Sequence, residues 1–93
     1  MIRSFACKDT AKLFERCFIK KLPTDIQRRA YKKLLEINHI KSVEDLRIPP
    51  SNHLEKLSGN RAGQYSIRIN GQWRICFRWS QGDAHDVEIV DYH

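Results

Sequence analysis

The chain has 93 residues, enough for about one small domain with a single core, so residues 1–93 are taken as one domain. No apolar run approaches the roughly 20 residues of a membrane span, and the first residues lack the apolar stretch of a secretion signal. Cys7, Cys17 and Cys76 show no CxxC spacing, so neither a disulfide framework nor a zinc site is predicted. These features predict a cytoplasmic protein that has no membrane segment and needs no metal or other cofactor.

The positive charge is concentrated in the first half of the chain. The formal net charge is +6, and residues 1–47 hold 12 Lys and Arg against 6 Asp and Glu, whereas residues 48–93 hold 5 of each. A basic surface of this kind favours a polyanionic partner such as RNA, although an ordinary solvated surface is the alternative.

The first 40 residues predict one short strand and two helices. Residues 1–6 alternate apolar and polar side chains, as a strand does, and residues 8–18 predict a helix capped by Asp9 or Thr10. Residues 20–40 predict a second helix, capped by Thr24 and buried along one stripe. That stripe consists of Ile26, Ala30, Leu34 and Ile37. The opposite face bears Arg28, Arg29, Lys32 and Lys33.

The second half of the chain predicts an antiparallel sheet. Residues 42–46 form at most one short turn, and Pro49 and Pro50 predict a loop before residues 53–57, which could begin a strand. Period-two alternation then predicts strands over 65–69, 73–79 and 87–92, joined by a hairpin at Asn70-Gly71 and a turn over 80–85. The fold class is therefore α+β, with two to three helices packed on a small antiparallel sheet.

Three arginines share the face of this sheet that is opposite the aliphatic and aromatic side chains. We call this the arginine face, and it is defined by Arg68, Arg74 and Arg78. Like charges on one face repel unless an anion lies between them, so the pattern favours phosphate binding over a merely solvated face.

The run "RAGQYSIRINGQWRICFRW" and the terminal "GDAHDVEIVDYH" resemble the HigB toxins of the RelE/ParE superfamily, and "MIRSFACKDTAKLFE" extends the resemblance over essentially the whole chain. The resemblance implies a RelE-like fold of helices on a twisted antiparallel sheet. It also implies a toxin of a type II toxin-antitoxin system that cleaves mRNA on the ribosome, an endoribonuclease without a metal. The implied partners are a HigA-like helix-turn-helix antitoxin, mRNA, and the ribosome at its A site on the 30S side. DNA is contacted only indirectly, through the antitoxin complex.

The resemblance also implies where the chemistry lies. RNA cleavage by the 2′-OH needs a proton acceptor, a proton donor and a cation for the phosphoryl oxygens. Arg74 would supply the cation, and the terminal Asp91, Tyr92 and His93 would supply proton transfer and RNA contacts, with His53 as a further catalytic candidate. The alternatives to these catalytic roles are structural: Arg74 could form a salt bridge with Glu88, and Tyr92 could simply pack on the sheet. The turn Ser58-Gly59-Asn60-Arg61 departs from the family pattern, in which lysine is frequent where Ser58 stands.

Two further groups of cations are assigned to binding. Four candidates for substrate binding are Lys56, Arg61, Arg68 and Arg78. Four candidates for ribosome binding are Arg28, Arg29, Lys32 and Lys33. Two other functions stay open at this point: a ParE-like poison of DNA gyrase, which needs no proton-transfer residues, and a non-catalytic RNA- or ribosome-binding module.

Overall fold

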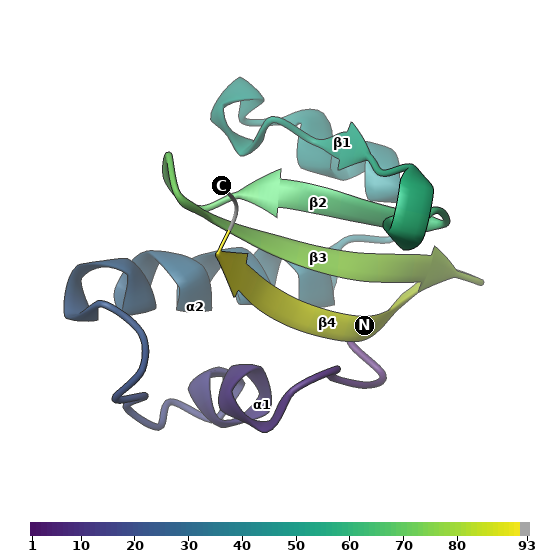
Figure 1. The fold of residues 1–93 in the computed structure, drawn as a ribbon. Coiled ribbons are helices and arrows are strands. Elements are labelled where there is room, and N and C mark those ends of the chain that lie inside the picture. The colour runs from purple at the N-terminus through teal and green to yellow at the C-terminus, as the bar shows by residue number, and fades with distance from the viewer. Residues whose placement is uncertain (92–93) are drawn as a thin grey trace.

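In the computed structural model, which describes residues 1–91, two α-helices pack on a four-stranded antiparallel sheet of order β1-β2-β3-β4 (Figure 1). The helical elements are α1 (Lys8–Phe14), α2 (Thr24–His39), η1 (Val43–Arg47), η2 (Pro50–Asn52) and η3 (Gly59–Arg61). The strands are β1 (Glu55–Lys56), β2 (Gln64–Arg68), β3 (Trp73–Ser80) and β4 (Asp83–Asp91). The predicted α+β class is confirmed, and β1 adds a short fourth strand to the meander.

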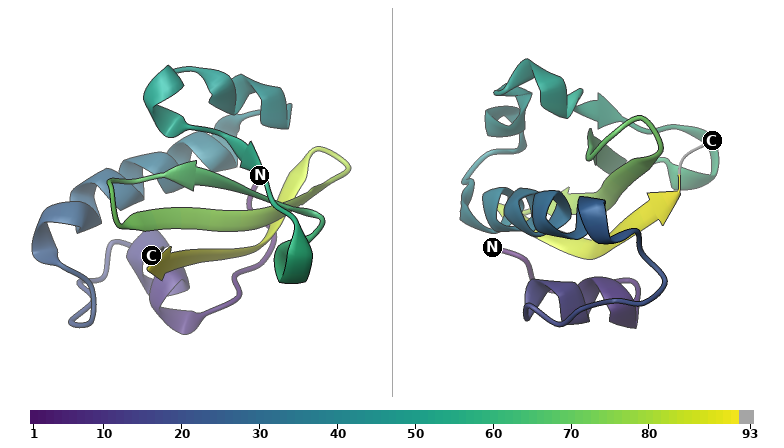
Figure 2. Two further views of the ribbon diagram at one scale, coloured as in Figure 1. Left: turned by 45° about the horizontal axis from the view of Figure 1, so that its top comes forward. Right: turned by 90° about the vertical axis from the view of Figure 1, so that its left-hand side faces the viewer.

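Helix α2 covers one face of the sheet with the predicted apolar stripe. Ile26 is 2% exposed, and Ala30, Leu34 and Ile37 are fully buried. They pack against Ile67, Ile75 and Phe77 of the sheet in one hydrophobic core. Figure 2 shows α2 lying across the back of the strands, with α1 beside β4. Within the described residues, no helix combines the length and apolar character that crossing a membrane would require.

The capping residues of both helices differ from the prediction, although α1 begins at Lys8 as predicted. The N-cap of α1 is Cys7, whose Sγ accepts a hydrogen bond from the backbone N–H of Thr10. The Thr10 side chain is instead buried, and its hydroxyl accepts a hydrogen bond from the backbone N–H of Ile89 at 3.1 Å. Helix α1 also ends four residues early, because the chain reverses through Arg16 in a left-handed conformation (φ 67°). Helix α2 begins at Thr24 itself, with Pro23 as its N-cap.

The predicted first strand forms only two isolated parallel bridges to β4, Ile2 to Ala84 and Phe5 to Val87. Continuous pairing is interrupted because β4 carries a bulge: the β3–β4 register shifts between Cys76 and Arg78, and Asp86 has a left-handed backbone (φ 53°). The segment is nonetheless anchored, since Asp83 pairs with both the Met1 ammonium at 3.2 Å and Arg3 Nε at 3.1 Å.

The two hairpins form where they were predicted, with different turns. At Asn70-Gly71 the Asn70 carboxamide accepts the backbone N–H groups of Gln72 and Trp73, each at 2.8 Å, so this side chain organises the turn. The second turn is tighter than the predicted 80–85, because only Gln81 and Gly82 (φ 51° and 79°) lie between β3 and β4.

We predict that Leu34→Ala lowers the free energy of unfolding by about 2–5 kcal/mol, because it leaves a cavity in the fully buried part of α2. The matched control is Leu35→Ala, one residue further on the same helix, where the leucine is only partly buried. Urea unfolding followed by circular dichroism measures both. Equal losses for the two variants would contradict the assignment of the core stripe.

Candidate active site

Arg74 on β3 is the most firmly held side chain of the arginine face. Its Nε donates to Ser66 Oγ at 2.9 Å, and its Nη2 donates to the backbone carbonyl of His53 at 2.7 Å. The side chain is only 11% exposed. These bonds commit Nε and Nη2 to protein acceptors and hold the guanidinium as an oriented, planar cation.

His53 ends η2 and is held close to Arg74 through its backbone. It adopts a left-handed conformation (φ 46°, ψ 54°), and the preceding residue, Asn52, is fully buried. The side chain of His53 is exposed. His53 therefore lies beside the arginine face, because its backbone carbonyl accepts a hydrogen bond from Arg74. The sequence alone did not fix this position, since the register of the loop around Pro49 and Pro50 could not be read from it.

Glu55 was missed in the sequence and also lies at this site. Its Oε1 is 3.5 Å from Arg74 Nη2, which places a carboxylate next to the cation. It stands on β1 in register with Ser66, the residue that also holds Arg74. In an extended segment His53 and Glu55 share a face, so side-chain alternation could have indicated Glu55. The strand β1 has only two residues, however, and gives little periodic signal.

The remaining sheet cations divide among three places. Arg68 is the register partner of Arg74, whereas Lys56 and Arg61 line a separate hollow between β1 and η3. Arg61 Nη1 donates to Glu88 at 3.0 Å, so the carboxylate that was the alternative partner for Arg74 is bound by Arg61. Arg78 lies further along β3, with its Nε 3.8 Å from Asp86. Of the four substrate-binding candidates, only Arg68 is a direct neighbour of Arg74.

Cys76 lies on the arginine face between these ion pairs. It is fully buried, and burial raises the pKa of its thiol despite the nearby charges of Arg61 and Arg74. The thiol therefore stays protonated at neutral pH and is a filler rather than a nucleophile. Among residues 1–91, no three His, Cys, Asp or Glu side chains lie close enough together to hold a metal ion.

Asp91 is the last described residue, and Tyr92 and His93 lie outside the described residues. Asp91 pairs with Trp73 at the start of β3, while its neighbour Val90 is the register partner of Arg74. Both carboxylate oxygens of Asp91 lie 3.2 Å from Gln72 Nε2. The end of β4 is therefore at the Arg74 end of β3, and Asp91 itself falls in the register that belongs to the opposite face.

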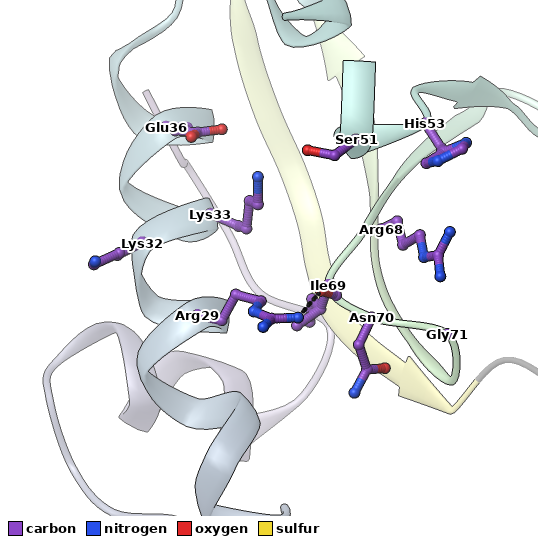
Figure 3. Close-up of a pocket in the computed structure, with 10 residues that line it drawn as sticks. All are labelled: Arg29, Lys32, Lys33, Glu36, Ser51, His53, Arg68, Ile69, Asn70 and Gly71. Carbon is purple, nitrogen blue, oxygen red and sulfur yellow. Dashed lines mark hydrogen bonds between the residues drawn. The ribbon is translucent and has the colours of Figure 1, made fainter. Parts of the chain in front are cut away.

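The four cations of α2 do not form a single surface. Arg29, Lys32 and Lys33 line a cleft of about 580 Å³ between α2 and the β2–β3 turn, with His53 and Arg68 on its other side (Figure 3). Arg29 Nη1 donates to the carbonyl of Ile69 at 3.1 Å across this cleft. Arg28 instead lines a different hollow, near Tyr31 and Phe18.

Comparison with known proteins assigns the chain to a family. Residues 3–93 match the family model described as a RelE-like toxin of type II toxin-antitoxin system HigB. Toxin HigB-1 of Vibrio cholerae is 41% identical over 63 residues, which span 68% of this chain and 66% of that protein. Endoribonuclease HigB of Proteus vulgaris is 32% identical over 93 residues, covering all of both chains.

The fold agrees with this assignment. The YoeB-YefM complex of Staphylococcus aureus contains a chain of similar fold, with a TM-score of 0.62 and 16% identity over 100% of this chain and 98% of that one. Together with the full-length family match, this confirms the resemblance expected from the terminal residues and the β3 motif. The chain belongs to the HigB-like family of RelE-like toxins of type II toxin-antitoxin systems.

Proposed function

We propose that this toxin is an endoribonuclease that cleaves mRNA on the ribosome and uses the arginine face around Arg74 for the chemistry. The observation that carries the proposal is the oriented guanidinium of Arg74, joined to the His53 backbone at 2.7 Å and next to the Glu55 carboxylate. The full-length similarity to the Proteus vulgaris protein named Endoribonuclease HigB supports the same class of activity.

In the proposed reaction the substrate's 2′-OH attacks the adjacent phosphorus. A P–O bond forms to the 2′-oxygen, the bond to the 5′-oxygen breaks, and the products are a 2′,3′-cyclic phosphate and a free 5′-OH. One group takes the 2′-OH proton and another protonates the leaving oxygen, roles proposed for His53 and His93. Asp91, which falls in the register of the opposite face, is proposed to orient a neighbouring imidazole rather than to take the proton itself. Arg74 stabilises the charge on the phosphoryl oxygens, and Tyr92 contacts phosphate or stacks on a base.

The proposed contacts outside the reaction centre are electrostatic. Lys56, Arg61, Arg68 and Arg78 follow the RNA backbone, while Arg28, Arg29 and Lys32 contact ribosomal RNA around the A site. Lys33, the fourth helix cation, is directed at Asn52 and is considered below. Phosphate contacts of this kind raise affinity without reading sequence.

An antitoxin partner follows from membership in a type II toxin-antitoxin family. The similar fold in Staphylococcus aureus was solved with YoeB bound to YefM. For this chain we propose a HigA-like helix-turn-helix antitoxin, which would bring the toxin to DNA only through the complex. We propose that the toxin acts in the cytoplasm, where translating ribosomes are.

We predict that expression without an antitoxin arrests growth and stops translation while DNA gyrase stays active. The expected signature is cleaved mRNA, mapped by primer extension, in cells whose DNA is unbroken. The gyrase-poison alternative predicts the reverse, intact mRNA with accumulating DNA breaks. Arrest with neither lesion would favour the non-catalytic ribosome-binding alternative.

We predict that Arg74→Ala slows cleavage of mRNA on programmed ribosomes by roughly 10²–10³-fold, because the oriented cation is lost. Arg74→Lys is expected to recover only part of the rate, since a point charge cannot reproduce a planar fork. The matched control is Arg47→Ala, which removes an exposed arginine of η1. A folded Arg74→Ala variant with the parental rate would exclude this role.

We predict that deleting His93, or changing it to Gln, slows cleavage by roughly 10²–10⁴-fold because a proton-transfer group is removed. Residues at chain termini usually contribute little to stability, so the circular dichroism spectrum and the melting temperature are expected to stay parental. The same ribosome assay measures the rate. Near-parental cleavage by a folded deletion variant would refute the role of the chain's last residue.

A further inference from the structure

The loop that carries His53 is tied to α2 by one buried side chain, that of Asn52. Asn52 is fully buried, and its Nδ2 donates to the carbonyl of Leu46 at 3.1 Å and lies 3.5 Å from Glu36 Oε2. Its Oδ1 accepts a hydrogen bond from Lys33 Nζ. Leaving a buried carboxamide without a hydrogen-bond partner lowers the stability of the folded state. The contacts with Lys33 and Glu36 therefore fix the position of η2 relative to α2.

Lys33 differs in this respect from the neighbouring cation of the helix. Lys32 is exposed, whereas Lys33 is partly buried, and Figure 3 shows its side chain reaching from α2 toward the loop with Ser51 and His53. The Lys33–Asn52 bond therefore joins α2 to η2 beside the cleft. A charge-assisted bond at a half-buried position is stronger than an exposed surface contact.

The residue after Asn52 is held from the opposite side. The carbonyl of His53 accepts from Arg74 Nη2 at 2.7 Å, and Arg74 is anchored to the sheet through Ser66. The short segment Asn52-His53 is thus fastened to α2 by Lys33 and to β3 by Arg74. A displacement of this segment changes both the position of His53 and the surroundings of the Arg74 guanidinium.

We infer that Lys33 and Asn52 form a clamp that positions His53 and Arg74 for cleavage, so that Lys33 is a positioning residue rather than a ribosome-binding one. The inference rests on the proposed function, because it assigns the clamp to the same reaction centre. Misplacement of reacting groups by about an ångström can cost about 100-fold in rate, so a residue that only fixes a loop can have a large kinetic effect.

The test separates ribosome association from the cleavage rate at saturating ribosomes. Lys33→Met keeps the apolar stem and removes the donor, and it is expected to lower the saturating rate roughly 10- to 100-fold with an unchanged dissociation constant for ribosomes. Lys33→Arg, which keeps a donor, is expected to recover part of the rate. Lys32→Met is expected to weaken association, increasingly so as salt is raised. The exposed Lys41→Met is the neutral control.

A double-mutant cycle of Lys33 and Asn52 provides a second, independent test of the clamp. Asn52→Leu replaces the carboxamide by an apolar group of similar shape, and the double variant Lys33→Met/Asn52→Leu is expected to be no slower than the slower single variant. Losses that multiply would contradict the clamp, as would a Lys33→Met variant that loses ribosome affinity and keeps its saturating rate.

NMR signals of backbone amides and of the Arg74 guanidinium test the clamp without relying on the mRNA cleavage assay. In Lys33→Met the signals of His53 and Arg74 Nε are expected to shift while those of β4 stay in place, and unchanged signals would overturn the clamp. If the parental protein itself fails to cut mRNA on ribosomes, the proposed function fails. The NMR and association measurements then still decide whether Lys33 holds the loop.

Discussion

The hydrogen bond from Arg74 to the carbonyl of His53 connects the sheet to the loop that follows the helical half of the chain. A guanidinium that is nearly buried has to be matched by acceptors, and Arg74 finds them in Ser66, His53 and Glu55. These acceptors come from β2, the end of η2 and β1, so one charged side chain draws three separate segments together. The candidate active site therefore forms where these three segments supply hydrogen-bond acceptors to the Arg74 guanidinium.

Helix α2 supports the same site from behind. Its apolar stripe fixes the helix against the sheet, and this places Lys33 and Glu36 opposite the buried Asn52. The cleft between α2 and the β2–β3 turn results from this spacing, with Arg29 crossing it to the carbonyl of Ile69. Cations that the sequence analysis assigned to the same helix face thus differ in what their donors contact, which is why we assign Lys32 and Lys33 different roles.

Local patterns predicted the repetitive part of the fold well. The stripe Ile26, Ala30, Leu34 and Ile37 and the alternation of β2 and β3 follow from burial on one face, which is a periodic constraint. The failures occur where a tertiary contact overrides a local preference. Asp9 or Thr10 was expected to cap the first helix, but Cys7 is the cap and the Thr10 hydroxyl accepts from Ile89 N. The expected first strand is interrupted by the bulge at Asp86.

The sequence by itself determined the fold class, the family and the face on which Arg68 and Arg74 lie, because periodicity and a family's motifs are written in neighbouring residues. Only the tertiary structure decided that Glu55 accompanies Arg74, that Arg61 binds Glu88, and that Lys33 turns inward to Asn52. These pairs join residues from 19 to 27 positions apart, and short-range patterns carry no information about which distant donor meets which acceptor. Packing of α2 on the sheet brings those groups within reach, and the cost of leaving buried polar groups unpaired then selects the partners.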